Sequence, residues 1–335
     1  MKQTETIDKM RPKEKFGRAL YLKKKCGKEF YNKYKQMFVD TACPACGGKG
    51  ESHYSVNGFK HRICRDCMTM WCSPRPTENL IEDYYSYSEA TKYWTELLLQ
   101  TNSDRQNLQH QLRVDDIVKK IKKHRNKESL LPLAVDMGAG SGAFASLLEK
   151  SNYFGRVIAV DFDHDCCQFC NHLGLETKQG SVEVLEDKSI NIITMNDLIE
   201  HLFDPREFLL KCRKKLTDNG YLFIACPNGQ GFDFQIMKEK TVNITPPEHL
   251  NYFNPYSISL LLESVGFNII SAETPGILDV DIVKRELPNS ISMDDNVYLK
   301  NLFMNASRET LKSFQEFLII NKLSSHMVIL AHKNQ

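Results

Sequence analysis

Long apolar runs are missing from this sequence, and so is any clear excess of charge. No stretch approaches the 18 or so apolar residues that cross a bilayer, and the opening MKQTETIDKMRPKEKF lacks the apolar core of a secretory signal. The 44 Lys and Arg residues against 42 Asp and Glu leave a net charge of +2, which points to no particular partner. We therefore expect a soluble, cytoplasmic protein without a membrane span.

The cysteines lack the pattern of a secreted disulfide framework. There are 11, an odd number, and four of them are grouped while the others are scattered. Internal repeats and low-complexity tracts are absent as well. With 335 residues, 41% of them hydrophobic, the chain is long enough for about two globular domains.

Changes in composition divide the chain into four segments. They are a basic helical arm at 1–40, a cysteine-rich module at 41–80, a helical connector at 81–128 and a large domain at 129–335 with an insertion at about 276–324. Residues 2–35 hold twelve Lys or Arg and only four acids, with aromatic residues between them. We expect these aromatics to dock the arm on the body; a phosphate-bearing partner and an oligomer contact are the alternatives.

Basic residues also crowd the end of the connector. They are Lys119, Lys120, Lys122, Lys123, Arg125 and Lys127. Positive charge at the last turn of a helix complements the helix dipole. We therefore interpret this group as the end of a well-terminated helix rather than as a nucleic-acid patch.

Four cysteines have the spacing of a structural metal site. The pairs Cys43-x-x-Cys46 and Cys64-x-x-Cys67 are separated by seventeen residues, within the range known for zinc. Four thiolates complete a tetrahedron and leave no open position for an activated water. We predict a zinc ribbon-like module in which Zn²⁺ supplies most of the folding free energy. A disulfide pair or an iron centre is the alternative.

From Leu131 onward, strand-like apolar runs alternate with helical stretches. The runs are LPLAVDMG, GRVIAVDFD, SINIITMN and GYLFIACPN, and SSHMVILAHK has the pattern of a last strand. Strands that alternate with helices of this length indicate βαβ units and a parallel sheet covered on both faces. The sequence therefore predicts an α/β fold for this domain.

A glycine-rich turn follows the first of these strands. Gly138, Gly140 and Gly142 permit a positive φ and let the backbone approach a ligand without a Cβ in the way. The pattern also fits a nicotinamide dinucleotide site, with Asp161 as the acid after the next strand. Asp136 favours a cationic ligand, because a carboxylate repels a pyrophosphate and attracts the ammonium of a methionine moiety.

Four motifs in this order resemble the class I S-adenosylmethionine (SAM) dependent methyltransferases: VDMGAGSG, the acid of VIAVDFD, IEHLFDP and GYLFIACPN. The resemblance covers about Leu131 to Phe267 and implies a seven-stranded sheet with SAM as cofactor. It also implies roles for single residues. The methionine part would be held by Asp136, Gly138, Gly140 and Gly142, the ribose by Asp161, the adenine by Phe162 and Ser181, and the sulfonium side by Asn196 and Asp197.

The segment Glu248-His249-Leu250 resembles the E-H-L segment of bacterial deoxysugar C-methyltransferases. In that family the histidine is the proposed base and an N-terminal zinc module helps to shape the acceptor site. The resemblance implies that His249 is the general base and that Glu248 orients it. This chain departs from the family at Pro246, where the family has a tyrosine.

A second histidine follows the fourth strand. Asp197-x-x-Glu200-His201 resembles the acidic cluster of ubiquinone-pathway O-methyltransferases, which can hold a divalent ion. The resemblance leaves open a Mg²⁺ ion at Asp197, Glu200 and His201 that lowers the pKa of a bound hydroxyl. We favour the alternative, in which Glu200 and His201 support the strand end by hydrogen bonds.

The acceptor that we expect is a small molecule, namely a nucleotide-linked sugar or another glycan precursor methylated on carbon or oxygen. Zinc-finger rRNA methyltransferases present an alternative in which the basic arm binds RNA. Two observations argue against RNA. The N-P-P-[FY] motif of enzymes that methylate exocyclic base nitrogens does not follow the fourth strand. The Cys226-Pro227 pair follows the fifth strand and not the fourth, where a cysteine nucleophile would be expected. Metal-assisted O-methylation of a small molecule and SAM binding without catalysis are further alternatives.

Overall fold

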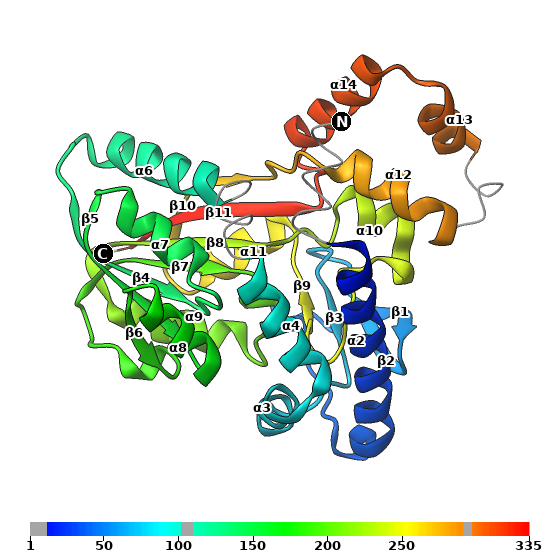
Figure 1. Cartoon of the computed structure of the whole chain (residues 1–335), viewed down its shortest axis with the longest axis horizontal. Helices are drawn as coiled ribbons and strands as arrows, with labels where there is room; N and C mark the ends of the chain where they lie inside the picture. The colour runs from blue at the N-terminus through cyan, green and yellow to red at the C-terminus, as the bar shows by residue number, and fades with distance from the viewer. Residues whose placement is uncertain (1–11, 102–109, 291–296, 335) are drawn as a thin grey trace.

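Two β-sheets organise the structure, a computed structural model that describes residues 12–101, 110–290 and 297–334 (Figure 1). The larger sheet has seven strands in the order β10-β11-β8-β7-β4-β5-β6. Their bounds are β4 (Leu131–Met137), β5 (Phe154–Asp161), β6 (Glu176–Gln179), β7 (Ile190–Asn196), β8 (Leu216–Pro227), β10 (Phe267–Glu273) and β11 (His326–Lys333). Strands β4 to β8 run parallel, β11 runs antiparallel to its neighbours β8 and β10, and β10 therefore points the same way as β8. The predicted α/β fold with a seven-stranded sheet is confirmed.

Helices cover both faces of the larger sheet. Successive side chains of a strand point to opposite faces, so Ala134 and Val135 of β4 belong to two different core clusters. Apolar residues of α6 (Gln111–Arg125), α7 (Ala143–Lys150) and α8 (His164–His172) pack in the cluster of Ala134, and those of α9 (Pro205–Lys215) and α11 (Pro255–Ser264) in that of Val135. The parallel strands of this sheet are therefore buried on both faces.

Capping sequences fix where α9 and α11 begin. The Asp204 carboxylate accepts a hydrogen bond from the backbone N–H of Glu207, and proline occupies the first turn of the helix. At the start of α11, Asn254 and Ser257 form a reciprocal capping box, again with proline in the first turn. Both helices therefore start directly after the loops at the carboxyl edge of the sheet.

The smaller sheet joins distant parts of the chain. Its strands are β1 (Glu51–Val56), β2 (Phe59–Ile63), β3 (Met70–Cys72) and β9 (Asn251–Tyr252), in the order β1-β2-β3-β9. Strand β9 pairs antiparallel with β3, and Trp71 lies opposite Asn251. The sequence predicts a small separate module at 41–80, and in the structure the large domain supplies the fourth strand of its sheet.

Three N-terminal helices pack beside the smaller sheet: α2 (Lys13–Tyr34), α3 (Glu78–Tyr87) and α4 (Glu89–Gln100). In Figure 1, α2 runs along this sheet and along α4. Phe30 of α2, Phe59 of β2 and Tyr84 of α3 share one buried cluster. The ring centroids of Phe30 and Tyr84 are 5.2 Å apart in an edge-on contact. Aromatic side chains thus attach the basic arm to the body of the protein.

Helices of the C-terminal part form a third apolar cluster. Phe232 of α10 (Phe232–Met237) packs there with residues of α12 (Asp279–Ser290), α13 (Val297–Asn305) and α14 (Arg308–Ile320). The last three helices lie between β10 and β11, where the sequence predicts an insertion. In Figure 1, α13 and α14 project from one end of the molecule.

Short 3-10 helices complete the described structure. They are η1 (Lys35–Met37), η3 (Val182–Val184), η4 (Ile199–His201) and η5 (Lys238–Lys240). Of these, η4 follows β7 at the carboxyl edge of the larger sheet. Within the three described ranges, no helix combines the length and the apolar composition that a bilayer span requires.

Candidate active site

The polar residues predicted to bind a cofactor lie at one edge of the larger sheet. Asp136 is near the end of β4, Asp161 ends β5 and Asn196 ends β7. These strands are parallel neighbours, so their carboxyl ends meet at the same edge. Ligands of open α/β sheets bind outside this edge, which makes it the candidate active site.

The glycine turn after β4 has the backbone conformation predicted for it. Gly138, Gly140 and Gly142 have φ values of 68°, 53° and 66°. A Cβ on Gly142 would lie 2.8 Å from the Leu175 side chain, so packing as well as φ requires glycine there. A Cβ on Gly140 would meet nothing within 4 Å. The Gly140 backbone therefore borders open space, as a backbone that approaches a ligand must.

Asp161 connects the glycine turn to the end of β5. Its Oδ2 accepts a hydrogen bond of 2.8 Å from the Gly140 N–H, and its Oδ1 accepts one of 2.9 Å from the Asp163 N–H. Burial raises the pKa of this carboxyl group above its usual value. A carboxylate has about four lone-pair sites, so Asp161 retains sites for the predicted ribose hydroxyls.

Asp136 is a buried acid, only 2% exposed. Its Oδ1 accepts a hydrogen bond of 2.7 Å from the Thr194 hydroxyl. Burial, with a smaller contribution from the charge of Asp161, raises the pKa of Asp136 to about 7. A cation brought beside this carboxyl group would stabilise its charged form, which agrees with the ammonium predicted to bind here.

Two residues that the sequence analysis missed lie beside the end of β7. The Arg113 guanidinium of α6 donates to Asn196 Oδ1 at 3.0 Å, and its other nitrogen lies 3.2 Å from His326 Nδ1. His326 Nε2 lies 2.8 Å from Asp197 Oδ1. No motif identifies Arg113 or His326, because these two side chains reach the end of β7 only in the folded chain.

The predicted adenine residues are accessible. Phe162 is 54% exposed, and its ring makes an edge-on contact with Tyr85 at a centroid distance of 5.6 Å. Ser181 is exposed as well, whereas Val182 beside it is buried. The structure thus places Phe162 and Ser181 at the surface beyond β5 and β6, on the side of the edge opposite Asn196.

His201 and His249 meet at this edge, with ring centroids 4.6 Å apart. His249 Nδ1 lies 2.8 Å from the Asn243 carbonyl oxygen, and the Tyr85 hydroxyl lies 2.5 Å from His201 Nδ1. A carbonyl can only accept, so His249 Nδ1 carries the proton and its Nε2 presents a lone pair. Tyr85 is 116 residues from His201 in the chain, so no local motif points to this contact.

The two histidines are neutral at ordinary pH. Burial, with a contribution from the Lys23 charge, lowers the pKa of His201 to about 4. Burial, His201 and Lys23 lower the pKa of His249 well below its usual value. Burial also raises the pKa of Tyr85, so the hydroxyl remains protonated and can donate to His201 Nδ1.

Glu248 does not contact the imidazole of His249, which corrects the predicted orienting role. Its Oε2 forms an ion pair with Lys23 Nζ at 2.5 Å, and Lys23 comes from α2. The Asn243 carbonyl oxygen orients His249 instead. The backbone turn that puts Glu248 next to His249 in sequence directs the Glu248 side chain toward α2.

The metal cluster left open at Asp197, Glu200 and His201 is also corrected, and so is the favoured prediction that the Glu200 side chain supports the strand end by hydrogen bonds. Ligand atoms of Glu200, His201 and His249 lie within 4.8 Å of one another, whereas Asp197 is paired with His326. Glu200 is 2% exposed, and neither carboxylate oxygen has a hydrogen-bond partner among the described residues. Burial raises the pKa of Glu200 well above its usual value. A buried carboxylate without a partner is where a proton or a cation binds favourably.

The four predicted cysteines lie together. Their Sγ atoms are within 4.8 Å of one another, and the closest pairs are 3.4–3.5 Å apart. In each Cys-x-x-Cys turn, the carbonyl oxygen of the first cysteine accepts a hydrogen bond from the backbone N–H four residues later. The donor is Gly47 in the first turn and Met68 in the second. These two residues share a positive φ, so the turns have matching form. The arrangement suits a tetrahedral metal ion with four thiolates.

Hydrogen bonds attach the cysteine turns to the large domain. Asn254 Nδ2 donates to the Cys67 carbonyl at 2.8 Å, and the Cys72 N–H donates to the Leu250 carbonyl at 2.9 Å. Buried Arg75 donates to Asn251 Oδ1 at 3.1 Å. Leu250, Asn251 and Asn254 are the first, second and fifth residues after His249 in the chain. The cysteine module therefore supports the segment that carries this histidine.

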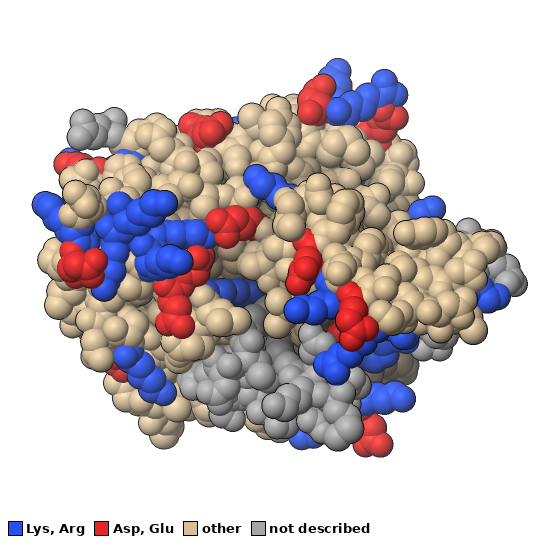
Figure 2. Space-filling view, turned by 90° about the horizontal axis from the view of Figure 1, so that it is seen from above, with Lys and Arg blue, Asp and Glu red and all other residues tan. Residues whose placement is uncertain are grey.

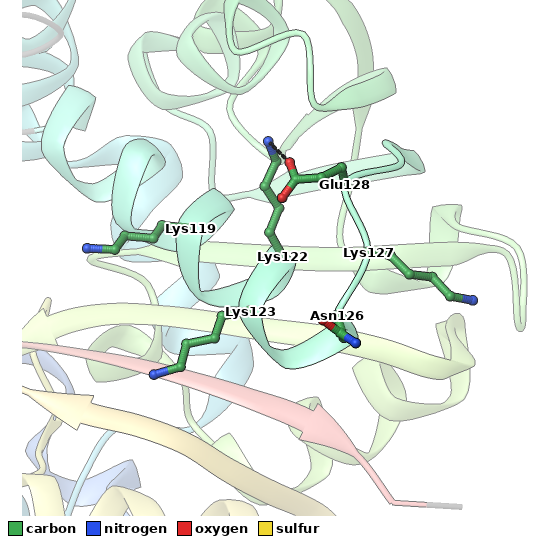
Figure 3. Close-up of a pocket in the computed structure, with 6 residues that line it drawn as sticks. All are labelled: Lys119, Lys122, Lys123, Asn126, Lys127 and Glu128. Carbon is green, nitrogen blue, oxygen red and sulfur yellow. Dashed lines mark ion pairs between the residues drawn. The ribbon is translucent and has the colours of Figure 1, made fainter.

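The basic end of α6 lies away from the candidate site. Figure 2 shows Lys and Arg side chains gathered at one side of the molecule. A hollow of about 400 Å³ there is lined by Lys119, Lys122, Lys123, Asn126, Lys127 and Glu128 (Figure 3). Lys122 pairs with Glu128 across it. This hollow precedes β4, at the edge of the sheet opposite the glycine turn, and Asn126 ends α6 in a left-handed conformation.

Comparisons with known proteins agree with this geometry. Residues 107–272 match the family model described as a methyltransferase domain. A protein of Mycolicibacterium smegmatis named "Probable S-adenosylmethionine-dependent methyltransferase" is 25% identical over 139 residues, which cover 40% of this chain and 51% of that protein. The chain therefore spans about half the length of this curated relative.

Other relatives match a larger share of the chain. The ubiquinone biosynthesis O-methyltransferase of Rickettsia canadensis is 25% identical over 212 residues, with 59% of this chain and 85% of that protein covered. Among solved structures, a SAM dependent methyltransferase from Archaeoglobus fulgidus matches with 21% identity and a TM-score of 0.43, over 66% of this chain and 94% of that chain. The seven-stranded sheet has the α/β Rossmann-like methyltransferase fold, and residues 107–272 match a methyltransferase domain.

Proposed function

We propose that this protein transfers the methyl group of SAM to a small hydroxylated acceptor, with a nucleotide-linked sugar or another glycan precursor as the preferred class. The observation that carries the proposal is the hydrogen bond from His249 Nδ1 to the Asn243 carbonyl. It leaves His249 Nε2 as a proton acceptor, beside His201 and at the carboxyl edge where SAM would bind. The E-H-L segment supports the sugar class.

For SAM, the edge of the sheet offers complementary groups. The Asp136 carboxyl would meet the ammonium of the methionine part, and the Arg113 guanidinium, which reaches Asn196, would meet its carboxylate. The ribose hydroxyls would bind Asp161, and the adenine would lie against Phe162. This arrangement holds the sulfonium toward the end of β7, where η4 and His201 follow.

Transfer itself needs an oriented acceptor and a place for its proton. The bond between sulfur and the methyl carbon breaks as the acceptor atom bonds to that carbon, which leaves S-adenosylhomocysteine. His249 Nε2 takes the proton of the acceptor hydroxyl, or of a C–H beside a keto group. If Tyr85 donates to His201 Nδ1, then His201 Nε2–H donates to the developing oxyanion.

For the cysteine cluster we propose a structural Zn²⁺ held by Cys43, Cys46, Cys64 and Cys67. The hydrogen bond from the Cys43 thiol lowers the pKa of Cys67 to about 5, so at least one thiolate is available at neutral pH. With four protein ligands the ion has no open position. Its contribution would be to fold the module that supports β9.

A turnover assay tests the proposed function. The full chain is incubated with methyl-tritiated SAM and a panel of nucleoside-diphosphate hexoses and their 4-keto-6-deoxy derivatives. We expect label in at least one sugar and a loss of about 10²- to 10⁴-fold in kcat for His249→Gln, with the affinity for S-adenosylhomocysteine unchanged. The control is His332→Gln, because His332 lies on β11 among Tyr221 and His124, away from the site.

Two outcomes of this assay would contradict the proposal. If the protein binds SAM but labels no sugar, the sugar class is wrong. If His249→Gln retains the activity of the unsubstituted protein, His249 is not the base. Isothermal titration with SAM in the same preparation separates a protein that binds without turnover from one that binds neither.

A second candidate function is metal-assisted O-methylation, favoured by the unpartnered oxygens of Glu200. Glu200, His201 and His249 would hold the ion, and this N and O donor set suits Mn²⁺, Fe²⁺ or Zn²⁺ better than Mg²⁺. The ion would lower the pKa of the acceptor hydroxyl. The name of the Rickettsia canadensis relative, a ubiquinone biosynthesis O-methyltransferase, supports small-molecule O-methylation.

Chelation distinguishes the two candidates. A metal-assisted enzyme loses activity after treatment with EDTA and regains it with Mn²⁺, whereas an enzyme that uses His249 as its base is unaffected. Zinc content is measured in the same samples, because loss of the ion from the four cysteines would also lower activity. Only samples that retain one zinc per chain are compared.

A further inference from the structure

One lysine of the basic arm is buried at the candidate active site. Lys23 of α2 is 9% exposed, and its Nζ forms an ion pair with Glu248 Oε2 at 2.5 Å. The same Nζ lies 4.3 Å from the centroid of the Trp94 ring. Lysine is almost never buried unless it is paired, because desolvation of the ammonium is costly. A lysine on the surface of this helix would avoid that cost. The buried position of Lys23 is therefore expected to have a structural or functional role.

The neighbouring lysines show how selective this contact is. Lys24, Lys25 and Lys28 of the same helix are exposed, and Lys25 pairs with Glu89 at the surface. The basic character of the arm therefore does not explain Lys23. Its contact with Glu248 joins residues 225 positions apart, directly before His249.

A second contact brings α2 against the same segment. A Cβ at Gly27, one turn after Lys23, would lie 2.6 Å from the Pro246 carbonyl oxygen. The backbone of α2 thus approaches the backbone of the segment 245–249 closely. Within that segment the N–H groups of Glu248 and His249 both donate to the Thr245 carbonyl. Gly27 and Lys23 together support the turn that carries the proposed base.

The ion pair leaves one oxygen of Glu248 without a partner. Glu248 is 3% exposed, and its Oε1 has no hydrogen-bond partner among the described residues. The Tyr84 hydroxyl is buried beside this carboxylate, and burial together with the Glu248 charge raises the pKa of Tyr84. A carboxylate oxygen can accept more than one hydrogen bond, so Oε1 can accept from a ligand hydroxyl as well as from Tyr84.

We propose that Lys23 is a positioning residue for the acceptor: by holding Glu248 Oε2, it directs Oε1 to accept a hydrogen bond from an acceptor hydroxyl beside His249. The inference rests on the proposed methyl transfer and extends it to the basic arm. It assigns the arm to the acceptor side of the active site. It also favours a neutral, hydroxylated acceptor group at this point, because a second anion would be repelled by Glu248.

Kinetics of Lys23 variants test this inference. The full chain is used with methyl-tritiated SAM and the nucleoside-diphosphate sugar that the unsubstituted protein methylates best. For Lys23→Met we expect the acceptor KM to rise about tenfold or more, with a smaller change in kcat and an unchanged affinity for S-adenosylhomocysteine. Lys23→Arg keeps the charge, so its acceptor KM should be close to that of the unsubstituted protein. Lys24→Met, an exposed neighbour, is the matched control.

Three results would overturn the inference: an unchanged KM in Lys23→Met, an equal KM rise in Lys24→Met, or a parallel loss of kcat and S-adenosylhomocysteine affinity. If Lys23→Met does not fold, Glu248→Gln decides, since it removes the ion pair with little change in shape. A KM rise like that expected for Lys23→Met supports the inference, and an unchanged KM overturns it. If the unsubstituted protein labels no sugar at all, the proposed function fails first, and this inference fails with it.

Discussion

The two sheets of this protein are built in different ways. In the larger sheet β4 to β8 follow one another along the chain, and each of their connections spans a short helical segment. The smaller sheet takes β1, β2 and β3 from 51–72 and β9 from 251–252. The first sheet holds the residues proposed for SAM, and the second adjoins the histidine proposed as the base.

This difference shows how the two halves of the reaction are separated. Loss of the cysteine module should disturb the acceptor side and leave the cofactor side in place, because β9 directly follows His249 while the glycine turn belongs to the other sheet. Loss of a cofactor residue should do the reverse. Substitutions on each side test this separation of the cofactor and acceptor sides.

The largest effect is expected from removal of one cysteine ligand. In Cys64→Ser we expect zinc content, measured by mass spectrometry, to fall from one ion per chain to none and methyl transfer to disappear. S-adenosylhomocysteine binding, measured by isothermal titration, should persist, because the glycine turn does not depend on β9. Cys26→Ser serves as the control, since Cys26 lies outside the cluster. Full activity in zinc-free protein would show that methyl transfer does not depend on the ion.

A smaller effect is expected from the cofactor side. Asp161→Ala removes the acceptor of two backbone hydrogen bonds and the predicted ribose contact. The dissociation constant for S-adenosylhomocysteine should rise by about 10- to 100-fold, as expected for hydrogen bonds to a charged group, with zinc content unchanged. Asp165→Asn, an exposed acid on α8, should bind as the unsubstituted protein does. An unchanged affinity in Asp161→Ala would remove Asp161 from the site.

The smallest effect concerns pH and the smaller sheet. Burial lowers the pKa of His61 on β2 to about 3, against an ordinary value of 6.5. Between these values the unfolded chain binds a proton that the folded chain does not, so stability falls as pH decreases from 6.5 toward 3. The slope should be roughly 1 kcal/mol per pH unit.

Denaturant unfolding of His61→Phe checks this slope. The phenyl ring preserves the aromatic contacts with Tyr54 and Tyr252 but cannot titrate. We expect the variant to lose less stability than the unsubstituted protein between pH 6.5 and pH 5. Thiol protonation affects both proteins equally, so equal slopes would show that His61 does not contribute.

Local spacing explains which features the sequence predicts well. The glycine turn and Asp161 follow successive strands, and strand order in βαβ units places them at one edge. Each pair of cysteines lies in one short turn, so its spacing predicts that the two thiols of the pair lie close together. Cys43 and Cys64 thus contribute to the same cluster even though seventeen residues separate the two pairs.

Contacts between distant segments explain what the sequence does not predict. The partner of Glu248 is Lys23, 225 positions away, rather than the adjacent His249. The partner of Asp197 is His326, 129 positions away, which removes Asp197 from the acidic cluster. Such pairs depend on how elements pack, and periodicity or motif spacing carries no information about them.

The pairing of β3 with β9 also constrains the order of folding during synthesis. About 180 residues lie between Cys72 and Asn251, so the smaller sheet acquires its last strand only after most of the chain has left the ribosome. Until then the backbone groups of β3 that face β9 have no partner and form an open edge. Nascent chains that stop before residue 251 should therefore be prone to strand-mediated association, and a chaperone that covers this edge would protect them.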